Sequence, residues 1–239
     1  MTNVREQIDY YSRQAARFDR SIWSLGKREN RNHEVKIRAI RRAITAEPGD
    51  RVLEVGTGTG LHGRWLLDQT LIYYTGVDAS PEMLGIAERR LDEHRGRFRL
   101  GIADAHRLPF PDGAFDAVFC SGTLHHLSDP ARGLKEMVRV TKPGGHVAAM
   151  EPNWKFPSVL LVTALEKAER NAFKINGPRM AAWARAAGIE DVRLERLLYT
   201  PPAPTRWARA YDRIDEMIGS VPGLRRLSIM LLVTGRRRR

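Results

Sequence analysis

The chain has 239 residues, with 40 lysines and arginines, 28 aspartates and glutamates, one cysteine and 42% hydrophobic residues. This composition indicates a globular protein of one domain, or of one domain with a lid, and excludes a disordered chain, a collagen and a disulfide scaffold. The single Cys120 can form neither an internal disulfide nor a multi-cysteine zinc site, and no metal-ligand spacing is present, so we predict no metal. The sequence shows no signal peptide and no apolar run that could span a bilayer, which predicts a cytoplasmic protein.

The net charge of +12 is distributed unevenly. Residues 1–50 carry 11 basic and 7 acidic side chains, residues 51–150 carry 12 of each, and residues 151–239 carry 17 and 9. A coat for nucleic acid would cover the whole surface, so we expect no nucleic-acid partner. The basic flanks predict an anionic acceptor or surface, whereas the run Arg236–Arg239 is interpreted as a solubilising tail.

Strand and helix patterns alternate through the first 150 residues, after a helical N-terminal segment. Short β-rich runs occur at 51–55, 71–77, 98–103, 115–120 and 146–150, and helical patterns lie between them. Because parallel strands need crossover connections and are buried on both sides, this alternation predicts a parallel sheet with helices on both faces. Arg28, Arg31 and His33 precede an amphipathic helix and are interpreted as a solvated face.

The regular alternation of strand and helix patterns ends after residue 151. A helical stretch at 160–188 is interrupted at Asn176-Gly177-Pro178, and a strand pattern follows at 191–199. Prolines at 201, 202 and 204 predict a stiff link to a helix at 206–218, and the apolar run 227–233 predicts the last strand.

The strongest local signal is the glycine-rich segment 54–60 (EVGTGTG), which directly follows the first predicted strand. Glycines there let a ligand approach the backbone closely. Gly58, Gly60 and Gly63 also have the dinucleotide G-x-G-x-x-G spacing, and Asp78 lies where a ribose-binding acid is expected. This pattern leaves a nicotinamide-dependent oxidoreductase open as an alternative.

The segments VLEVGTGTG, GVDASPEML, ADAHRLPFPDGAFDAVFCSGTLHHLSDP and RVTKPGG occur in this order over about residues 50–150. Together they resemble the motifs of class I S-adenosylmethionine-dependent methyltransferases, in particular the type 11 branch of ubiquinone, menaquinone and natural-product methyltransferases. The resemblance implies an α/β fold, a Rossmann-like doubly wound seven-stranded sheet with an antiparallel last strand and a helical cap over the substrate. It divides the chain into an N-terminal helical lid, 1–45, and a methyltransferase domain, 46–239, with cap segments at about 155–188 and 203–222.

The resemblance also implies S-adenosylmethionine as the cofactor and S-adenosylhomocysteine as its product. Glu54 is then expected to orient the glycine loop and the cofactor amino group, Asp78 to bind the ribose hydroxyls, and Asp104 to meet the adenine amino group. Such a ligand has no phosphate and needs hydrogen-bond acceptors, and the three acids end three successive predicted strands. The further predicted cofactor contacts are Tyr11, Gly56, Thr57, Gly58, Gly60, Ala79, Met83, Ala105 and Cys120.

His125 and His126 follow the fourth strand and are the candidate catalytic residues, because a neutral imidazole is the usual general base near pH 7. Tyr10, Glu151 and Asn153 are candidate substrate contacts. The expected reaction is in-line methyl transfer to a small-molecule acceptor, with oxygen as the first choice. Nitrogen or carbon acceptors, including a lipid or quinone precursor, remain open, as does a non-catalytic nucleotide- or RNA-binding module. The oligomeric state stays open too.

Overall fold

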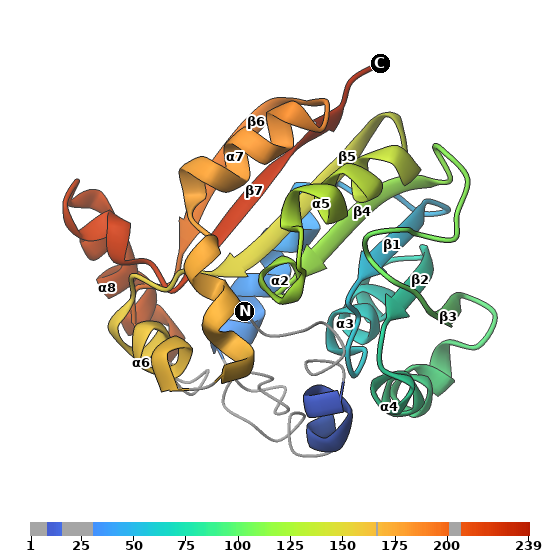
Figure 1. The fold of residues 1–239 in the computed structure, drawn as a ribbon, viewed down its shortest axis with the longest axis horizontal. Helices are drawn as coiled ribbons and strands as arrows, with labels where there is room; N and C mark the ends of the chain where they lie inside the picture. The colour runs from blue at the N-terminus through green and yellow to red at the C-terminus, as the bar shows by residue number, and fades with distance from the viewer. Residues whose placement is uncertain (1–8, 16–30, 166, 201–206) are drawn as a thin grey trace.

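The computed structural model describes residues 9–15, 31–165, 167–200 and 207–239 (Figure 1). Predictions that concern residues 16–30 and 201–206, among them Arg28 and the three prolines, lie outside these ranges. After a short helix at 9–15, the elements follow in this order: α2 (Arg31–Ile44), β1 (Arg51–Val55), α3 (Leu61–Gln69), β2 (Tyr73–Asp78), α4 (Pro81–Leu91), the 3-10 helix η1 (Asp92–His94), β3 (Phe98–Ile102), β4 (Phe115–Ser121), η2 (Leu124–His126), α5 (Pro130–Val140), β5 (Thr141–Pro152), α6 (Pro157–Leu165), η3 (Lys167–Lys174), α7 (Gly177–Ala186), β6 (Ile189–Leu197), α8 (Ala208–Ser220), η5 (Leu224–Leu227) and β7 (Met230–Arg237).

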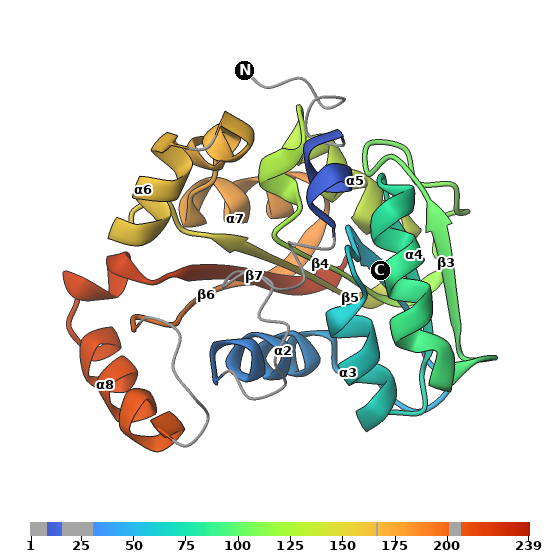
Figure 2. The ribbon, with the colours of Figure 1, turned by 90° about the horizontal axis from the view of Figure 1, so that it is seen from below.

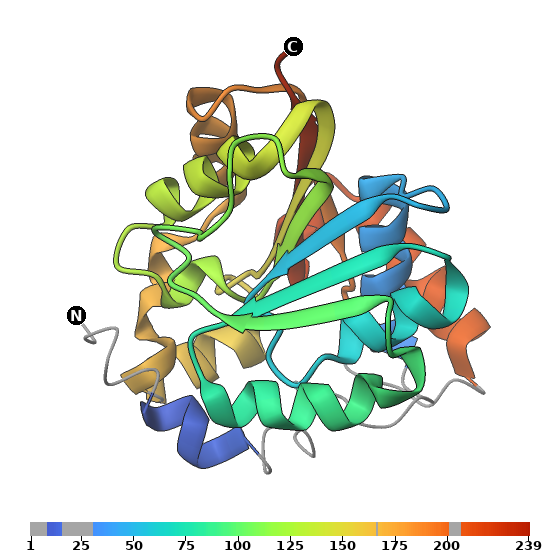
Figure 3. The ribbon, with the colours of Figure 1, turned by 90° about the vertical axis from the view of Figure 1, so that its right-hand side faces the viewer.

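Seven strands form one sheet in the order β3-β2-β1-β4-β5-β7-β6. The first five strands along the chain pair in parallel, whereas β7 runs antiparallel between β5 and β6. β3 lies at one edge, with α4 beside it (Figure 3). The predicted α/β sheet with an antiparallel last strand is therefore confirmed.

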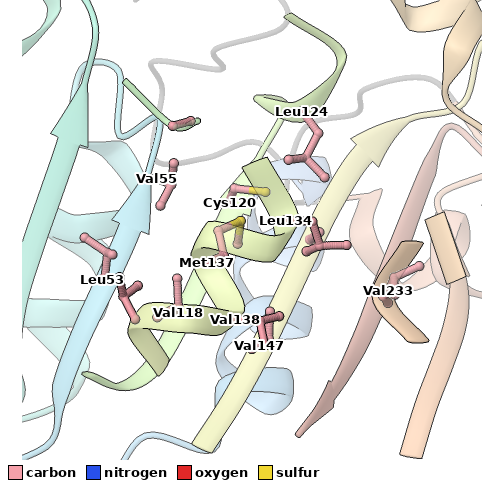
Figure 4. Packing of buried hydrophobic residues seen from close by; sticks show 14 of the residues in the cluster. Leu53, Val55, Val118, Cys120, Leu124, Leu134, Met137, Val138, Val147 and Val233 are labelled. Atoms are coloured by element: carbon pink, nitrogen blue, oxygen red, sulfur yellow. The ribbon is translucent and has the colours of Figure 1, made fainter. Parts of the chain in front are cut away.

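Helices cover both faces of this sheet. In Figure 2, α2 and α3 lie on one face, and α5 and α7 lie on the other. Successive strand residues point to opposite faces. Leu53 and Val55 of β1 accordingly join the core beneath α5, whereas Val52 joins the core beneath α2 and α3. Figure 4 shows the first of these cores, in which Leu134 and Met137 of α5 pack on the strands.

The strand order reverses direction between β1 and β4, since β2 and β3 extend to one side of β1 and the later strands to the other. In open parallel sheets, ligands bind at the carboxyl ends of the strands where the order reverses. The fold therefore predicts a ligand-binding site at the loops that follow β1 and β4.

The C-terminal arginine run differs from its prediction as a solubilising tail. β7 begins at Met230 and continues to Arg237, so it lies three to four residues later than the apolar run indicated. Arg236 pairs with His146, and the Arg237 guanidinium donates to the Arg139 carbonyl at 2.6 Å and to the Thr141 carbonyl. These carbonyls lie where α5 passes into β5, so the arginines close that corner of the sheet.

The interpretation of Arg31 and His33 as a solvated face is wrong, because both side chains are buried. Arg31 begins α2 and donates from Nε to Asp212 at 2.7 Å and from Nη2 to Asp215 at 2.6 Å. Both acids lie in α8, so the buried guanidinium joins the two helices.

Among the described helices, none is long and apolar enough to cross a membrane.

Candidate functional site

A cavity of about 950 Å³ opens at the carboxyl ends of the central strands. Its wall includes the glycine loop after β1, the turn after β2, the loop after β3 and the histidine loop after β4. Twelve of the residues predicted from the sequence line it: Tyr10, Tyr11, Gly56, Thr57, Gly58, Asp78, Ala79, Met83, Asp104, Ala105, His125 and His126. Five others, namely Glu54, Gly60, Cys120, Glu151 and Asn153, are not among the lining residues.

The glycine loop has a backbone that favours glycine. Gly56, Gly58 and Gly60 have φ angles of 75°, 53° and 76°, in the left-handed region that other residues rarely adopt. A Cβ atom on Gly56 would lie 2.2 Å from Thr123 Oγ1, so a side chain there would collide with the loop after β4. The loop therefore brings main-chain atoms to the cavity, where a side chain would otherwise stand.

Asp78 ends β2 and faces this loop. Its Oδ2 accepts from the Gly58 amide at 2.8 Å, and its Oδ1 accepts from the Ser80 amide at 3.0 Å. Burial raises the pKa of Asp78, and the backbone hydrogen bonds oppose that shift. An ionised carboxylate has about four lone-pair positions, so this oriented group can still accept hydrogen bonds from two hydroxyls of a ligand.

Asp104 follows β3 and has a different environment. Its Oδ1 accepts from the amide of His106 at 2.8 Å and lies 2.7 Å from the Nδ1 atom of the same residue. Burial would raise the pKa of Asp104, but the hydrogen bonds from His106 lower it, so the group is ionised at neutral pH. The side chain is 64% exposed and lines the cavity two strands away from β1, where it can accept a hydrogen bond from a ligand amino group.

Glu54 lies beneath the cavity. Its Oε1 lies 2.8 Å from His62 Nδ1, and its Oε2 accepts from the hydroxyls of Thr57 and Tyr74. Burial and the neighbouring Glu54 carboxylate raise the pKa of Tyr74, which keeps that hydroxyl protonated as a donor. The carboxylate thus holds the glycine loop from below, while its predicted contact with the cofactor amino group stays a prediction.

Cys120 and Gly60 are also set back from the cavity. Cys120 is fully buried in the core beneath α5, where burial raises the pKa of its thiol (Figure 4). Gly60 is the N-cap of α3, and a Cβ there would lie 3.0 Å from the Cβ of Ala87 in α4. Cys120 and Gly60 were predicted to contact the cofactor. They do not line the cavity, because both pack against neighbouring protein atoms.

The histidine loop is held by a buried carboxylate. Glu151 in β5 accepts from the amides of Thr123 at 3.0 Å and Leu124 at 2.8 Å through Oε1. Its Oε2 lies 2.6 Å from His125 Nδ1 and also accepts from the His125 amide at 3.3 Å. Glu151 therefore shapes the loop from inside, and this accounts for its absence from the cavity wall, where we had predicted a substrate contact.

His125 is the charged member of the histidine pair. Its Nε2 lies 3.2 Å from Glu169 Oε2, in η3, so a carboxylate faces each ring nitrogen. Burial alone would lower the pKa of His125, but Glu151 and Glu169 raise it to about 10. At neutral pH the imidazolium donates from both nitrogens, so His125 has no lone pair to accept a proton.

His126 is the neutral member. Burial and the adjacent His125 charge lower its pKa to about 3. Its Nδ1 is buried and has no hydrogen-bond partner among the described residues. The ring centroid lies 4.8 Å from that of Tyr11, whose hydroxyl donates to Glu169. Because the ring is neutral at neutral pH, one of its two nitrogens is a hydrogen-bond acceptor.

Asn153 has a structural contact where a substrate contact was predicted. Its Nδ2 donates to the carbonyls of Arg226 at 3.0 Å and Ser228 at 2.8 Å, so the side chain fastens the segment before β7. The residue follows β5 as expected, but its amide turns toward the neighbouring chain rather than toward the cavity.

Among the residues of the cavity wall that the sequence analysis did not predict, two carry a charged side chain, Glu169 and Lys36. Glu169 stands in a helical stretch that carries no motif, and it meets the histidines only through the fold. Lys36, on α2, also lines the cavity, although its helix has an ordinary amphipathic pattern. No spacing rule could connect either residue to the glycine loop.

The ligand atoms of His125, His126 and Glu169 lie within 4.8 Å of one another, and could hold a metal ion that the sequence did not predict. The hydrogen bonds among these groups, with Tyr11 and Glu151, already satisfy His125 and Glu169. The geometry is therefore accounted for by protein contacts alone.

Residues 53–149 match a family model described as "Methyltransferase domain". The demethylmenaquinone methyltransferase of Beutenbergia cavernae is 40% identical over 120 residues, which cover 49% of this chain and 48% of that protein. The chain thus matches about half the length of the curated relatives of this kind. Residues 53–149, which match the family model, contain the glycine loop, Asp78, Asp104 and the histidine loop.

Solved structures resemble the chain over a longer stretch. A putative methyltransferase in complex with the Trm112 activator from Haloferax volcanii has a TM-score of 0.70, 22% identity, and coverage of 99% of this chain and 98% of that one. Phosphoethanolamine N-methyltransferase 2 from Haemonchus contortus, solved with S-adenosylhomocysteine, has a TM-score of 0.72, 18% identity, and coverage of 100% and 61%. At these identities, the likeness establishes the fold.

Proposed function

We propose that this chain, whose residues 53–149 match the methyltransferase domain model, transfers a methyl group from S-adenosylmethionine to a small-molecule acceptor. The observation that carries the proposal is the cavity in which the glycine loop, Asp78 and Asp104 face a common space. These groups end three neighbouring strands, β1, β2 and β3. The resemblance found in the sequence is thereby supported at the level of the site.

The cavity wall fits this ligand chemically. S-adenosylmethionine has ribose hydroxyls, an adenine amino group and a sulfonium, and it has no phosphate. Asp78 and Asp104 offer acceptors for the hydroxyls and the amino group, while the wall contains no arginine among the described residues. A nicotinamide dinucleotide would bring a pyrophosphate, which the amides of a glycine loop can bind without basic side chains. The match of residues 53–149 to the methyltransferase model is what favours the methyltransferase over the oxidoreductase.

The bound methyl donor supplies an electrophilic methyl group with an excellent leaving group, so the protein's main task is to position the reactants in a dry site. The helix at 9–15 contributes to this enclosure in our proposal. Ser12 Oγ lies 2.8 Å from Ser80 Oγ at the start of α4, and Tyr11 bonds to Glu169 in η3. The helix thereby bridges two walls of the cavity, which supports a role of residues 9–15 in the predicted lid.

For the acceptor we propose a hydroxyl oxygen that donates its hydrogen bond to His126 Nδ1. An oxygen becomes far more acidic as it is alkylated, so a weakly basic imidazole suffices to take its proton. His125 is the positioning residue, because its two carboxylate contacts fix the loop on which His126 stands. His126 lines the cavity, and its neutral ring has an Nδ1 without a hydrogen-bond partner among the described residues, which supports a role as proton acceptor.

Amine and carbon acceptors are the second candidates, because relatives are named for both. The Caenorhabditis elegans phosphoethanolamine N-methyltransferase 2 is 28% identical over 173 residues, and a ubiquinone/menaquinone biosynthesis C-methyltransferase of Geotalea daltonii is 34% identical over 112 residues. We do not extend the proposal to an anionic acceptor, since Lys36 is the one lysine or arginine of the described cavity wall.

The test begins with binding. S-adenosylhomocysteine is expected to raise the melting temperature of the protein, whereas NAD is expected to leave it unchanged. Phenol, amine and quinol panels are then assayed for release of S-adenosylhomocysteine. In His126→Ala, turnover of a hydroxyl acceptor should fall roughly a hundredfold with cofactor affinity intact. His146→Ala, on β5 away from the cavity, is the control, and equal turnover in both variants would exclude His126 as the proton acceptor.

A further inference from the structure

Large apolar side chains are exposed at one end of the molecule. Of the thirteen such side chains among the described residues, nine lie in the segments 157–165 and 207–227. The first segment is α6, and the second contains α8 and η5. Figure 1 and Figure 2 both show α6 and α8 at the same end, on the left. Exposed apolar side chains that gather in this way, rather than being scattered singly, indicate an interaction surface.

α8 presents an exposed apolar stripe, and none of its 13 residues is buried. The exposed apolar side chains recur at intervals of seven, three and four residues, which is the spacing of one helix face: Trp207, Ile214, Met217 and Val221. Asp212 and Asp215, which bind Arg31, lie on the side of the helix away from Met217. α8 is therefore attached to the domain by its polar side, with the apolar stripe directed outward.

α6 has one side on the cavity and the other side exposed. Val159 and Thr163 are buried and line the cavity, whereas Leu160, Leu161 and Leu165 are exposed. None of the nine residues of α6 is charged. The helix thus separates the cavity from an apolar outer surface.

Exposed arginines accompany the apolar stripe. Four of them lie on α8 and η5, and none has an ion pair among the described residues: Arg209, Arg213, Arg225 and Arg226. Of the three acids in the segment 207–227, two are bound to the buried Arg31. The surface therefore combines apolar side chains with positive charge that the described protein does not neutralise.

This combination indicates the chemistry of the partner. A second copy of the chain, docked through the same surface about a two-fold axis, would bring the two sets of arginines together, and like charges repel. An anionic lipid bilayer instead offers phosphates to the arginines and an apolar layer to the stripe. Trp207 fits the same boundary, because indole rings concentrate where a bilayer meets water. The charge and the apolar stripe thus complement one partner together.

We infer that α8, η5 and α6 dock on the surface of an anionic lipid bilayer. The apolar stripe of α8 and the outer leucines of α6 enter the boundary between headgroups and acyl chains, and the four arginines meet lipid phosphates. Docking in this orientation places α6 between the bilayer and the cavity, because its inner side lines the cavity. The inference concerns the outer surface alone, so it does not depend on the proposed methyl transfer.

Sedimentation with vesicles measures the docking of the full chain. Vesicles of phosphatidylcholine are compared with vesicles of equal parts phosphatidylcholine and phosphatidylglycerol. We expect the anionic vesicles to bind the wild type about tenfold or more tightly, since each arginine near the surface contributes about 1 kcal/mol. The binding should weaken as the salt concentration rises, because salt screens exposed charges.

Variants with matched controls locate the contact. Met217→Gln should weaken binding to anionic vesicles by about tenfold, because it removes an apolar side chain from the stripe. Its control is Leu71→Gln, since Leu71 is equally exposed but precedes β2 on the other side of the sheet. The double variant Arg225→Gln/Arg226→Gln should lose most of the preference for anionic vesicles. Its control is Arg89→Gln/Arg99→Gln, on the exposed sides of α4 and β3.

Several results would overturn the inference. Wild-type protein that leaves anionic vesicles unbound, or binds neutral vesicles equally well, would do so without any variant. Equal binding by Met217→Gln and Leu71→Gln would show that the stripe of α8 is not the contact. A dimer in analytical ultracentrifugation that Met217→Gln dissociates would assign the surface to a second copy of the chain. Binding of S-adenosylhomocysteine without vesicles tests the proposed function separately, so the two failures are distinguishable.

Discussion

Replacing Glu151 with glutamine tests how the histidine loop is held. The carboxylate receives four N–H groups: the Thr123 and Leu124 amides on Oε1, and the His125 amide and ring on Oε2. Glutamine can keep the two contacts on its amide oxygen. Its NH2 group would then face the His125 N–H groups, so two donors would lose their acceptor and the His125 charge would lose a counterion.

The magnitude follows from the contacts that are lost. A hydrogen bond to a charged group contributes about 1.5 to 3 kcal/mol, and a buried N–H left without an acceptor costs about 1 to 3 kcal/mol. We therefore expect the free energy of unfolding to fall by about 3 kcal/mol. For a chain of this size, that change corresponds to a melting temperature lower by about 6 to 12 °C.

The difference should depend on pH. Because the pKa of His125 is raised to about 10 in the folded protein, against an ordinary value of 6.5, its contribution is fully present below pH 6.5. That contribution is lost as the pH rises toward 10, and the variant lacks the share that Glu151 supplies, whereas the contact with Glu169 remains. The gap between wild type and variant should thus be widest near pH 6 and narrow toward pH 10.

Differential scanning calorimetry across this pH range measures both effects. Glu190→Gln is the matched control, since Glu190 pairs with the exposed Arg238 and should contribute less than about 1 kcal/mol. A Glu151→Gln protein that melts within about 1 °C of the wild type would refute the reasoning about the buried carboxylate. A gap that stays constant with pH would refute the charge assigned to His125.

Three further predictions concern other contacts. Asp78→Ala should weaken S-adenosylhomocysteine binding by about 1.5 to 3 kcal/mol in calorimetric titration, and unchanged affinity in a folded variant would contradict the ribose contact. Arg31→Met should lower the free energy of unfolding by about 2 kcal/mol, because Asp212 and Asp215 lose their shared guanidinium. Denaturant titration measures this change, and Arg38→Met, on the exposed side of α2, is the control. Truncation after Gly235 should lower the melting temperature more than truncation after Arg237, since the first also removes the strand pairs of Arg236 and Arg237 with β5 and β6; equal loss would mean that the arginines contribute as a tail after all.

The sequence predicted the parts of the fold that depend on local pattern. Alternating β-rich runs and helices are sufficient for the doubly wound sheet, and the glycine-rich segment 54–60 marks its own loop through the backbone that glycine permits. Asp78 and Asp104 could be found because each ends a strand, and strand ends in a parallel sheet share one edge. The residues on the proposed cofactor side of the cavity could therefore be predicted from the sequence.

The contacts that the sequence missed join segments far apart in the chain. Arg31 can be buried because it pairs with acids that lie about 180 residues later in the chain. Glu169 contacts His125 from a helix whose sequence carries no motif. Charge alone predicts solvent exposure for such residues, because an unpaired charge is almost never buried. The pairing that reverses this expectation exists only in the folded chain, so a single sequence cannot reveal it.

The position of β7 has a consequence for the order in which the sheet can be completed. β6 joins the sheet through β7 alone, although it precedes β7 along the chain. While the five parallel strands can pair as they emerge from the ribosome, β6 has no neighbour until residues 230–237 are synthesised. α7 packs on α5 as well as on β6 and β7, so it can complete its contacts only when β7 has formed. Until then its apolar side toward β6 and β7 is exposed, and exposed apolar surface in a nascent chain favours aggregation.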